Sequence, residues 1–443
     1  MKRFLVIGLF IFVTAVLSAQ TIDLEEARLL ALANSRSLAR FETLIRSSVL
    51  SERDQLYTML PVISANYSAS MSYLRDWEFV NPFDTFRAGV NFSLTQLIFN
   101  GGRSFINRAI RSIATESERK SALAEYFNVL DAVDNAYYAV LEATAALNAA
   151  ESLLQSSRLN LQIAEVRAAN GIINRGEYLR VLANMESQEN SVNQARRTLS
   201  MNTTRFRNLT GITEHVELEP INFEIYDDVI HRLAAITDDE ADALFTELWY
   251  LMTVSNPSIA QAALASKRAE LDLSNAKREL TPTIRATIVS GDLTYSALGG
   301  FNTSGNGSIS ITGTIPIDFW NYANRVERST IARDNAAVNF LSTQSSLEFD
   351  LQSTLFNLFR QAGSILSSRR ILQYTEQDFE FVSERYRLSQ SSVTELNSAS
   401  TSLINSQNSL NSASFAFLQS LSRLRSLCAL DDEQRLLEIL LGN

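Results

Sequence analysis

The sequence is poor in the residues that usually carry chemistry or break helices: its 443 residues include 1 Cys, 2 His, 15 Gly and 6 Pro. The single Cys428 excludes an internal disulfide. His215 and His231 lie sixteen residues apart in an irregular segment, which makes a poor metal site and leaves no convincing Ser-His-Asp constellation. No glycine-rich phosphate-binding loop is present. We therefore expect no enzyme activity, no cofactor and no metal, and any energy source has to lie in a partner.

Positive charge and long apolar runs are also scarce. The formal net charge is −10, and without Lys2 and Arg3 the chain carries 37 basic and 49 acidic residues, a balance of −12. With no Lys/Arg-rich run, nucleic acid is not an expected partner. The one notable apolar run, Phe4–Val13, follows Lys2-Arg3 and precedes small residues before Gln20, which is the order of a cleaved secretory signal peptide at 1–19. Beyond it no run of 18 apolar residues predicts a membrane-spanning helix.

The strongest pattern that is present is an apolar seam with a period of seven residues. It covers every seventh residue from Leu351 to Tyr386 and, after a short break, from Leu396 to Leu424. Subtracting 218 from these numbers gives a second seam of the same form, from Val133 to Ala168 and from Tyr178 to Phe206. A heptad seam makes long helices pack side by side. The chain is therefore predicted to be a tandem repeat.

Each repeat is predicted to contain one long helical hairpin, at 103–209 and 321–427. The segment between the repeats is irregular, with a short β-like stretch at Asn222–Ile225. At the start of the chain, Asp23 is a plausible helix N-cap with Glu26 three residues on. The expected division is signal peptide 1–19, first repeat 20–210, linker or equatorial segment 211–238, second repeat 239–428 and C-terminal tail 429–443.

Four segments alternate apolar with small polar residues, at about 62–75, 86–98, 283–296 and 306–317. This period of two predicts strands with two contrasting faces, although the phase slips near Ser290-Gly291 and indicates a bulge or an early strand end there. The strands are about the length needed to cross a bilayer. The alternative, a sheet capping a soluble coiled coil, leaves the apolar face without anything to pack on. Four strands cannot close a membrane barrel, so more than one chain has to contribute.

The sequence resembles the TolC-like outer-membrane efflux protein family, the outer-membrane factors of tripartite efflux pumps and type I secretion systems, over essentially the whole mature chain. Three segments carry the resemblance: Ile22–Ala27 at the start, Leu60-Pro61 before the first strand, and Leu94–Gly102 where strand becomes helix. Ile315–Phe319 is the counterpart of the last segment in the second repeat.

The resemblance implies an α+β membrane protein in which the tandem repeat gives a trimeric, 12-stranded transmembrane β-barrel, with four strands per chain. A long α-helical periplasmic barrel of coiled-coil hairpins continues it. The implied location is the cell outer membrane, with the helical domain in the periplasm. The implied partners are two further copies of the chain, a periplasmic adaptor (membrane fusion) protein, an inner-membrane transporter and outer-membrane lipid.

The family's gate motif at the hairpin ends carries over by position. Its tyrosine matches Tyr386, its first constricting aspartate matches Glu395, and the aspartate on the first-half return helix matches Glu177. Its arginine and second aspartate fall on Ser391 and Ser398. Its glycine falls on Ser389 in the second half and is kept as Gly171 in the first, and these two tips are the expected adaptor contacts. A ring of Glu395 carboxylates would attract cations at the narrowest point.

Each assignment has a plainer alternative. Glu395 and Glu177 could be ordinary residues at helix starts, stabilised by the helix dipole, and Tyr386 continues the heptad seam. For the whole protein, the expected function is a passive exit duct from periplasm to exterior. The competing function is a structural or adhesive coiled-coil protein displayed at the cell surface without transport activity.

Overall fold

The computed structural model describes residues 21–70, 86–213, 217–296, 299–303, 306–388 and 390–442. The predicted signal peptide, the end of the strand expected at 62–75, His215 and Ser389 lie outside these residues. The chain forms two compact units: one comprises Met1–Ser35, Tyr126–Met252 and Asp350–Asn443, and the other Arg36–Glu125 and Thr253–Phe349. Each unit therefore draws on both halves of the sequence.

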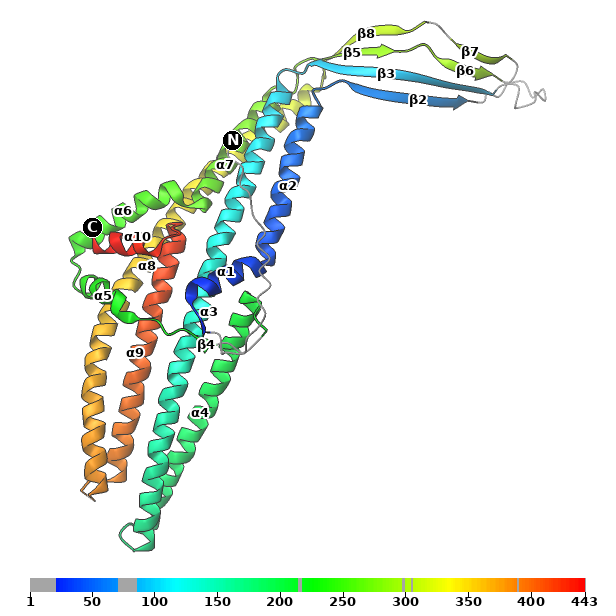
Figure 1. The fold of residues 1–443 in the computed structure, drawn as a ribbon. Helices are drawn as coiled ribbons and strands as arrows, with labels where there is room; N and C mark the ends of the chain where they lie inside the picture. Colours follow the sequence, from blue (N-terminus) through cyan, green and yellow to red (C-terminus); the bar gives the residue numbers. More distant parts are fainter. Residues whose placement is uncertain are drawn as a thin grey trace. The chain divides into compact units, whose positions relative to one another are not determined.

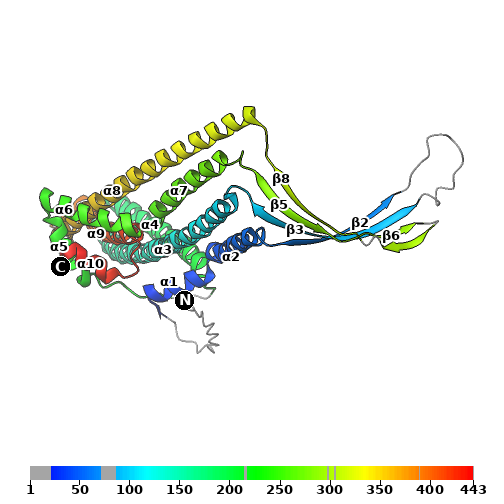
Figure 2. The same ribbon diagram turned by 90° about the horizontal axis from the view of Figure 1, so that it is seen from above.

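The second unit contains an antiparallel sheet and the helices that lead into and out of it. The helical parts are α2 (Arg36–Tyr57), α7 (Pro257–Lys277) and the first parts of α3 (Arg103–Ala169) and α8 (Phe319–Arg387). The six strands are β2 (Val62–Ser70), β3 (Arg87–Phe99), β5 (Thr283–Val289), β6 (Leu293–Ser296), β7 (Gly300–Thr303) and β8 (Ser308–Thr314). Figure 2 shows β2, β3, β5 and β8 alongside one another.

Strand β3 is the centre of this sheet. It pairs along one edge with β2, from Val62↔Thr95 to Ser70↔Arg87, and along the other with β5 and β6. The outer row is made of β8, which pairs with β5, and β7, which pairs with β6. The sheet is thus four rows wide, with β2 at one edge and β7 and β8 at the other.

The break predicted near Ser290-Gly291 is present, since β5 ends at Val289 and β6 begins at Leu293. The strand expected at 283–296 is interrupted at Ser290, where the side chain takes over one of the backbone hydrogen bonds to Phe92. The Ser290 amide donates to the Phe92 carbonyl at 2.8 Å, and the Ser290 hydroxyl accepts from the Phe92 amide at 3.0 Å. The phase slip in the sequence marks this bulge. The strand expected at 306–317 is β8, which ends at Thr314, before Pro316, which has no amide hydrogen for a ladder. The strand β7 precedes this range, at a place where no strand was predicted.

The first unit contains the helical hairpins (Figure 1). Within it, the remainder of α3 lies beside α4 (Arg175–Thr210) and the remainder of α8 beside α9 (Val393–Leu427). At 67 residues, α3 extends about 100 Å at ~1.5 Å per residue. All seam positions named from the sequence are buried or half-buried, including Leu351, Leu358 and Leu424 at 0 % exposure. The heptad prediction is confirmed.

Shorter elements complete the first unit. Asp23 caps α1 (Leu24–Asn34) by accepting from the Glu26 amide at 2.7 Å, as predicted. The stretch expected to be β-like at Asn222–Ile225 is instead a 3-10 helix, η1, because the Asn222 side chain accepts from the Glu224 amide at 3.0 Å and starts a helical turn. The remaining elements are β1 (Thr21–Ile22), which pairs in parallel with β4 (Glu217–Leu218), η1 (Phe223–Tyr226), α5 (Asp227–Ala234), α6 (Asp238–Ser255) and α10 (Glu433–Leu441).

A buried ionic cluster joins three helices of this unit around Asp134, whose side chain is fully buried. Its carboxylate accepts from Arg28 of α1 at 2.7 and 2.8 Å, and from Ser422 and Arg425 of α9 at 2.7 and 2.9 Å. A buried charge is tolerated only when it is paired and hydrogen-bonded. The cluster therefore ties the start of the chain to both hairpins.

Among the described helices, none combines the length and apolar character that a membrane crossing needs.

Candidate gate at the hairpin ends

The turn between α8 and α9 is closed by hydrogen bonds on both sides. The Gln390 amide donates to the Arg385 carbonyl at 2.7 Å, and the Arg385 guanidinium donates back to the Gln390 carbonyl at 2.8 Å. Ser392 then caps α9 by accepting from the Glu395 amide at 3.2 Å, while the Glu395 carboxylate accepts from the Ser392 amide at 3.4 Å. This reciprocal pair is a capping box.

Glu395 is therefore both a capping residue and an exposed negative charge. Its carboxylate also accepts a short hydrogen bond from the Ser391 hydroxyl. Hydrogen bonds from Ser391 and from the Ser392 amide lower the pKa of Glu395, since they stabilise the charged form. The plainer alternative and the gate hypothesis are thus compatible, because a carboxylate held at the start of the helix can still face a channel.

The turn between α3 and α4 has a comparable construction. Gly171 adopts a left-handed conformation with φ of +70°. The Ile172 amide donates to the Arg167 carbonyl at 2.9 Å, which gives a hydrogen-bond partner to one of the last carbonyls of α3. Asn174 caps α4 by accepting from the Glu177 amide at 2.9 Å. Glu177 is half-buried in the first turn of α4, a position that the helix dipole favours for an acid.

The two hairpins meet at Tyr386. Its ring is 2 % exposed and belongs to an apolar cluster formed by residues of both hairpins: Ala164, Val181, Tyr386, Val393 and Leu396. Arg167 of α3 lies over this ring, with its guanidinium carbon 4.7 Å from the ring centre. The same guanidinium donates to the carbonyls of Tyr386 at 2.6 Å and Arg387 at 3.0 Å. One arginine thus binds both the ring and the last backbone carbonyls of α8.

The hydroxyl of Tyr386 is buried, and no described atom accepts or donates a hydrogen bond to it. Burial raises the pKa of this phenol, while the neighbouring Arg167 opposes the shift. The nearby charge of Glu177 acts in the same direction as burial, so the electrostatics of Tyr386 and Glu177 are coupled. The side chain is a neutral packing group at ordinary pH.

The structure thus brings together some of the residues expected from sequence and separates others. Tyr386 and Glu177 interact electrostatically, and Ser391 binds Glu395. Ser398 is exposed on α9, three residues beyond Glu395, and Gly171 is exposed in its turn.

Arg167 was not predicted, although it is the residue that holds Tyr386. One feature of the sequence points to Arg167: shifted by the repeat length of 218 residues, it corresponds to Arg385. Each repeat therefore has an arginine just before the end of its first long helix. The arginine that the family pattern places at Ser391 is thus absent there, and a different arginine, from the other hairpin, binds the tyrosine.

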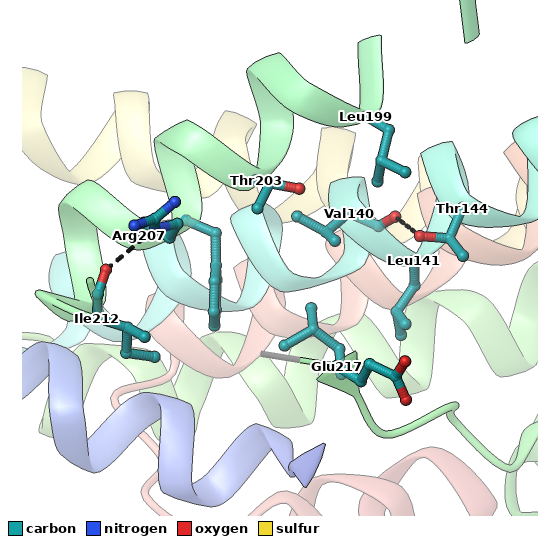
Figure 3. Close-up of a pocket in the computed structure, with 10 residues that line it drawn as sticks. Val140, Leu141, Thr144, Leu199, Thr203, Arg207, Ile212 and Glu217 are labelled. Carbon is teal, nitrogen blue, oxygen red and sulfur yellow. Dashed lines mark hydrogen bonds between the residues drawn. The ribbon is translucent and has the colours of Figure 1, made fainter. Parts of the chain in front are cut away.

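A separate pocket of about 370 Å³ lies between α3, α4 and the linker (Figure 3). Two of its polar side chains form hydrogen bonds with backbone carbonyls. The Thr144 hydroxyl donates to the Val140 carbonyl at 2.8 Å, and the Arg207 guanidinium donates to the Ile212 carbonyl at 3.2 Å. The lining residues are Val140, Leu141, Thr144, Leu199, Thr203, Phe206, Arg207, Ile212, Glu217 and Leu218.

Comparison with known proteins extends the resemblance found in the sequence. The model of the family described as "Outer membrane efflux protein" matches residues 28–212 and 248–429, which is most of the chain. A search of curated proteins found no match.

Solved structures share the fold at low identity. The Campylobacter jejuni CmeC outer membrane channel has a TM-score of 0.77 at 15 % identity, over 94 % of this chain and 89 % of that one. VceC, an outer membrane protein of Vibrio cholerae, has a TM-score of 0.75 at 14 % identity, over 92 % and 97 %. The open state of the Neisseria gonorrhoeae MtrE outer membrane channel has a TM-score of 0.73 at 18 % identity, over 92 % and 89 %. On the family match across both halves of its sequence, the chain belongs to the outer membrane efflux protein family.

Proposed function

We propose that this protein is the outer-membrane exit duct of a tripartite efflux or type I secretion system. Three copies form one channel, which passively conducts substrates from the periplasm to the exterior when an adaptor and an inner-membrane transporter engage it. The duct itself does no chemistry, and the partner pump selects and drives the cargo.

The observation that carries this proposal is the two-faced sheet with unpaired edges. On one face, isoleucine and aromatic side chains are exposed, including Ile63, Tyr67 and Ile309. On the other, polar side chains bond across the strands: Asn66 donates to Asn91 at 3.1 Å and to Ser93 at 3.2 Å. An apolar exterior around a polar interior is the pattern of a transmembrane barrel.

The edges of the sheet require further copies. Among the described strands, β2 pairs only with β3, and β8 only with β5. Open edges are not tolerated in lipid, and the smallest membrane barrels have about eight strands. Pairing β2 of one copy with β8 of the next closes the barrel, and three copies give the twelve rows that the family resemblance implies.

The helix α8 supports the same assembly. Besides its buried seam, it has a second apolar stripe, whose members Phe349, Phe356, Tyr374 and Phe381 each lie two residues from a seam position. Two residues turn the helix by about 200°, so this stripe faces away from the chain's own hairpin. Large exposed apolar surfaces mark interaction sites, and we assign this one to the neighbouring copy.

Within this assembly we place the periplasmic gate at the hairpin ends, formed by Glu395, Glu177, Tyr386, Ser391 and Ser398. The turns at Gly171 and Ser389 would contact the adaptor. The cluster around Tyr386 supports this placement, because it joins the two hairpins of one chain with a small number of interactions that can be released together.

Conductance tests the proposal. The purified oligomer in a planar lipid bilayer should give small currents that favour cations, since the carboxylates of the proposed gate, the exposed Glu395 and the half-buried Glu177, attract them. A folded, oligomeric protein that never forms a channel would contradict the proposal and favour the adhesive alternative. Boiled protein is the negative control.

A further inference from the structure

The charges of the sheet have the opposite sign to those of the proposed gate. In the six described strands, the charged side chains are Arg87 of β3 and Arg285 of β5, and both are exposed. The chain as a whole is acidic, with a net charge of −10. The described strands therefore carry positive charge only, whereas the chain as a whole is acidic.

Both arginines lie on the polar face. Arg87 is opposite Ser70 of β2 on one side and Ser296 of β6 on the other. It lies four residues before Asn91 on β3, so it is on the same face as Asn91, whose side chain accepts a hydrogen bond from Asn66. Arg285 is opposite Thr312 and two residues from Thr287, whose hydroxyl lies 3.5 Å from that of Thr95. Cross-strand partners share a face. In a closed barrel this face is the lumen.

The described part of the chain gives neither guanidinium an ion-pair partner. Asp292, which follows β5 on the chain, lines the same hollow of the sheet as Arg87. However, its carboxylate accepts from the Asn91 amide group at 3.0 Å and forms no salt bridge with any residue in the described ranges. An arginine outside a salt bridge keeps N–H donors that a ligand can use.

Arg87 also lines a hollow of about 340 Å³ on this face. Its walls supply hydroxyl and amide groups, among them Ser68, Ser70, Asn91 and Asn302, and one carboxylate, that of Asp292. A cation surrounded by small hydrogen-bonding groups is suited to an anion such as a carboxylate, sulfate or phosphate ester.

The two arginines lie near opposite ends of the strands. Arg285 pairs with Leu97, which is ten residues along β3 from Arg87. At about 3.4 Å per residue this is roughly 34 Å, comparable with the thickness of a bilayer's apolar core. One arginine is near the end of the sheet that joins the helices, and the other is near the loop end.

We propose that Arg87 and Arg285 form two anion-attracting rings in the barrel lumen, one residue of each kind per copy. This inference rests on the proposed function, because it needs the closed barrel. Rings of arginine attract anions, and a lumen with low-dielectric walls strengthens their field. Anionic solutes are thereby concentrated in the barrel after passing an acidic gate, and Asp292 weakens the effect at one level.

The test is block of the single-channel current by hexacyanoferrate(II), a tetravalent anion, added from the barrel side. Arg87→Gln with Arg285→Gln should weaken the block at least about tenfold, since each ring loses one charge per copy. Arg87→Lys with Arg285→Lys keeps the charges and should retain most of the block. Asp292→Asn, which keeps an acceptor for Asn91, should strengthen it.

The outcomes separate this inference from the proposed function. Channels that conduct normally but show equal block in the wild type, the Gln pair and Asp292→Asn would overturn the anion rings and leave the duct intact. If the Gln pair does not fold, Asp292→Asn alone decides. A folded wild-type oligomer without any current would overturn the duct, and the anion rings with it.

Discussion

The guanidinium carbon of Arg167 lies 4.7 Å from the centre of the Tyr386 ring, and the same guanidinium donates to the Tyr386 carbonyl at 2.6 Å. Arg167 belongs to the first hairpin and Tyr386 to the second. The contact therefore spans the two hairpins of one chain at the place where the proposed gate has to open. It combines a ring contact with bonds to carbonyls that lack partners inside the helix.

Removing this contact should loosen the gate. Arg167→Ala should raise the conductance of the resting channel in planar bilayers, because the end of α8 loses its link to α3. Arg167→Lys keeps the charge but loses the planar fork, so it should give an intermediate value. Arg370→Gln is the matched control, since Arg370 is exposed on α8 and donates to the Leu366 carbonyl of its own helix. Equal conductance in the wild type and Arg167→Ala would remove Arg167 from the gate.

The proposed cation ring at Glu395 is tested by block. Glu395→Ala should weaken block by multivalent cations added from the periplasmic side, because the constriction loses one negative charge per copy. Glu395→Gln separates charge from capping, since its amide oxygen can still accept from the Ser392 amide. We expect both variants to lose block to a similar extent. Retained block in Glu395→Gln would show that the charge of Glu395 is not at the constriction.

The pH dependence of that block follows from the hydrogen bonds to Glu395. Ser391 and the Ser392 amide lower its pKa, so the carboxylate stays charged below the ordinary glutamate pKa of about 4.3. Its contribution is complete above the ordinary value and is lost as the pH falls through the lowered one. Ser391→Ala should shift the loss of cation block to higher pH. A pH profile that Ser391→Ala leaves unchanged would contradict the assignment.

The cluster around Asp134 should dominate the stability of the first unit. Asp134→Asn removes the fully buried charge that Arg28 and Arg425 share and leaves them the more distant Glu433 carboxylate, at 3.4 and 3.8 Å, so we expect a loss of about 3–5 kcal/mol in unfolding free energy. Denaturant unfolding monitored by helical circular dichroism measures it. Asp378→Asn, at an exposed position on α8, is the matched control and should change the value by less than about 0.5 kcal/mol. Equal stability of the two variants would contradict the role of the cluster.

The helices and strands could be predicted from sequence, because each follows from a pattern that repeats over a few residues. The heptad seam that includes Leu351 and the alternation at Ile63 are set by the helix and strand periods, and both elements formed where expected. Arg167 could not be predicted, because its role depends on Tyr386, which is 219 residues away and comes close only in the folded chain. The interruption at Ser290 depends on a side chain that replaces a ladder bond to Phe92, and the phase slip indicated its place but not its cause.

The central claim is that several copies close one barrel, and the mass of the detergent-solubilised particle tests it most directly. Native mass spectrometry of the purified protein should give a particle of three chains, each close to 49.4 kDa less the signal peptide. A single chain as the stable folded species would contradict the account, because the open edges at β2 and β8 would then have no partner in the membrane.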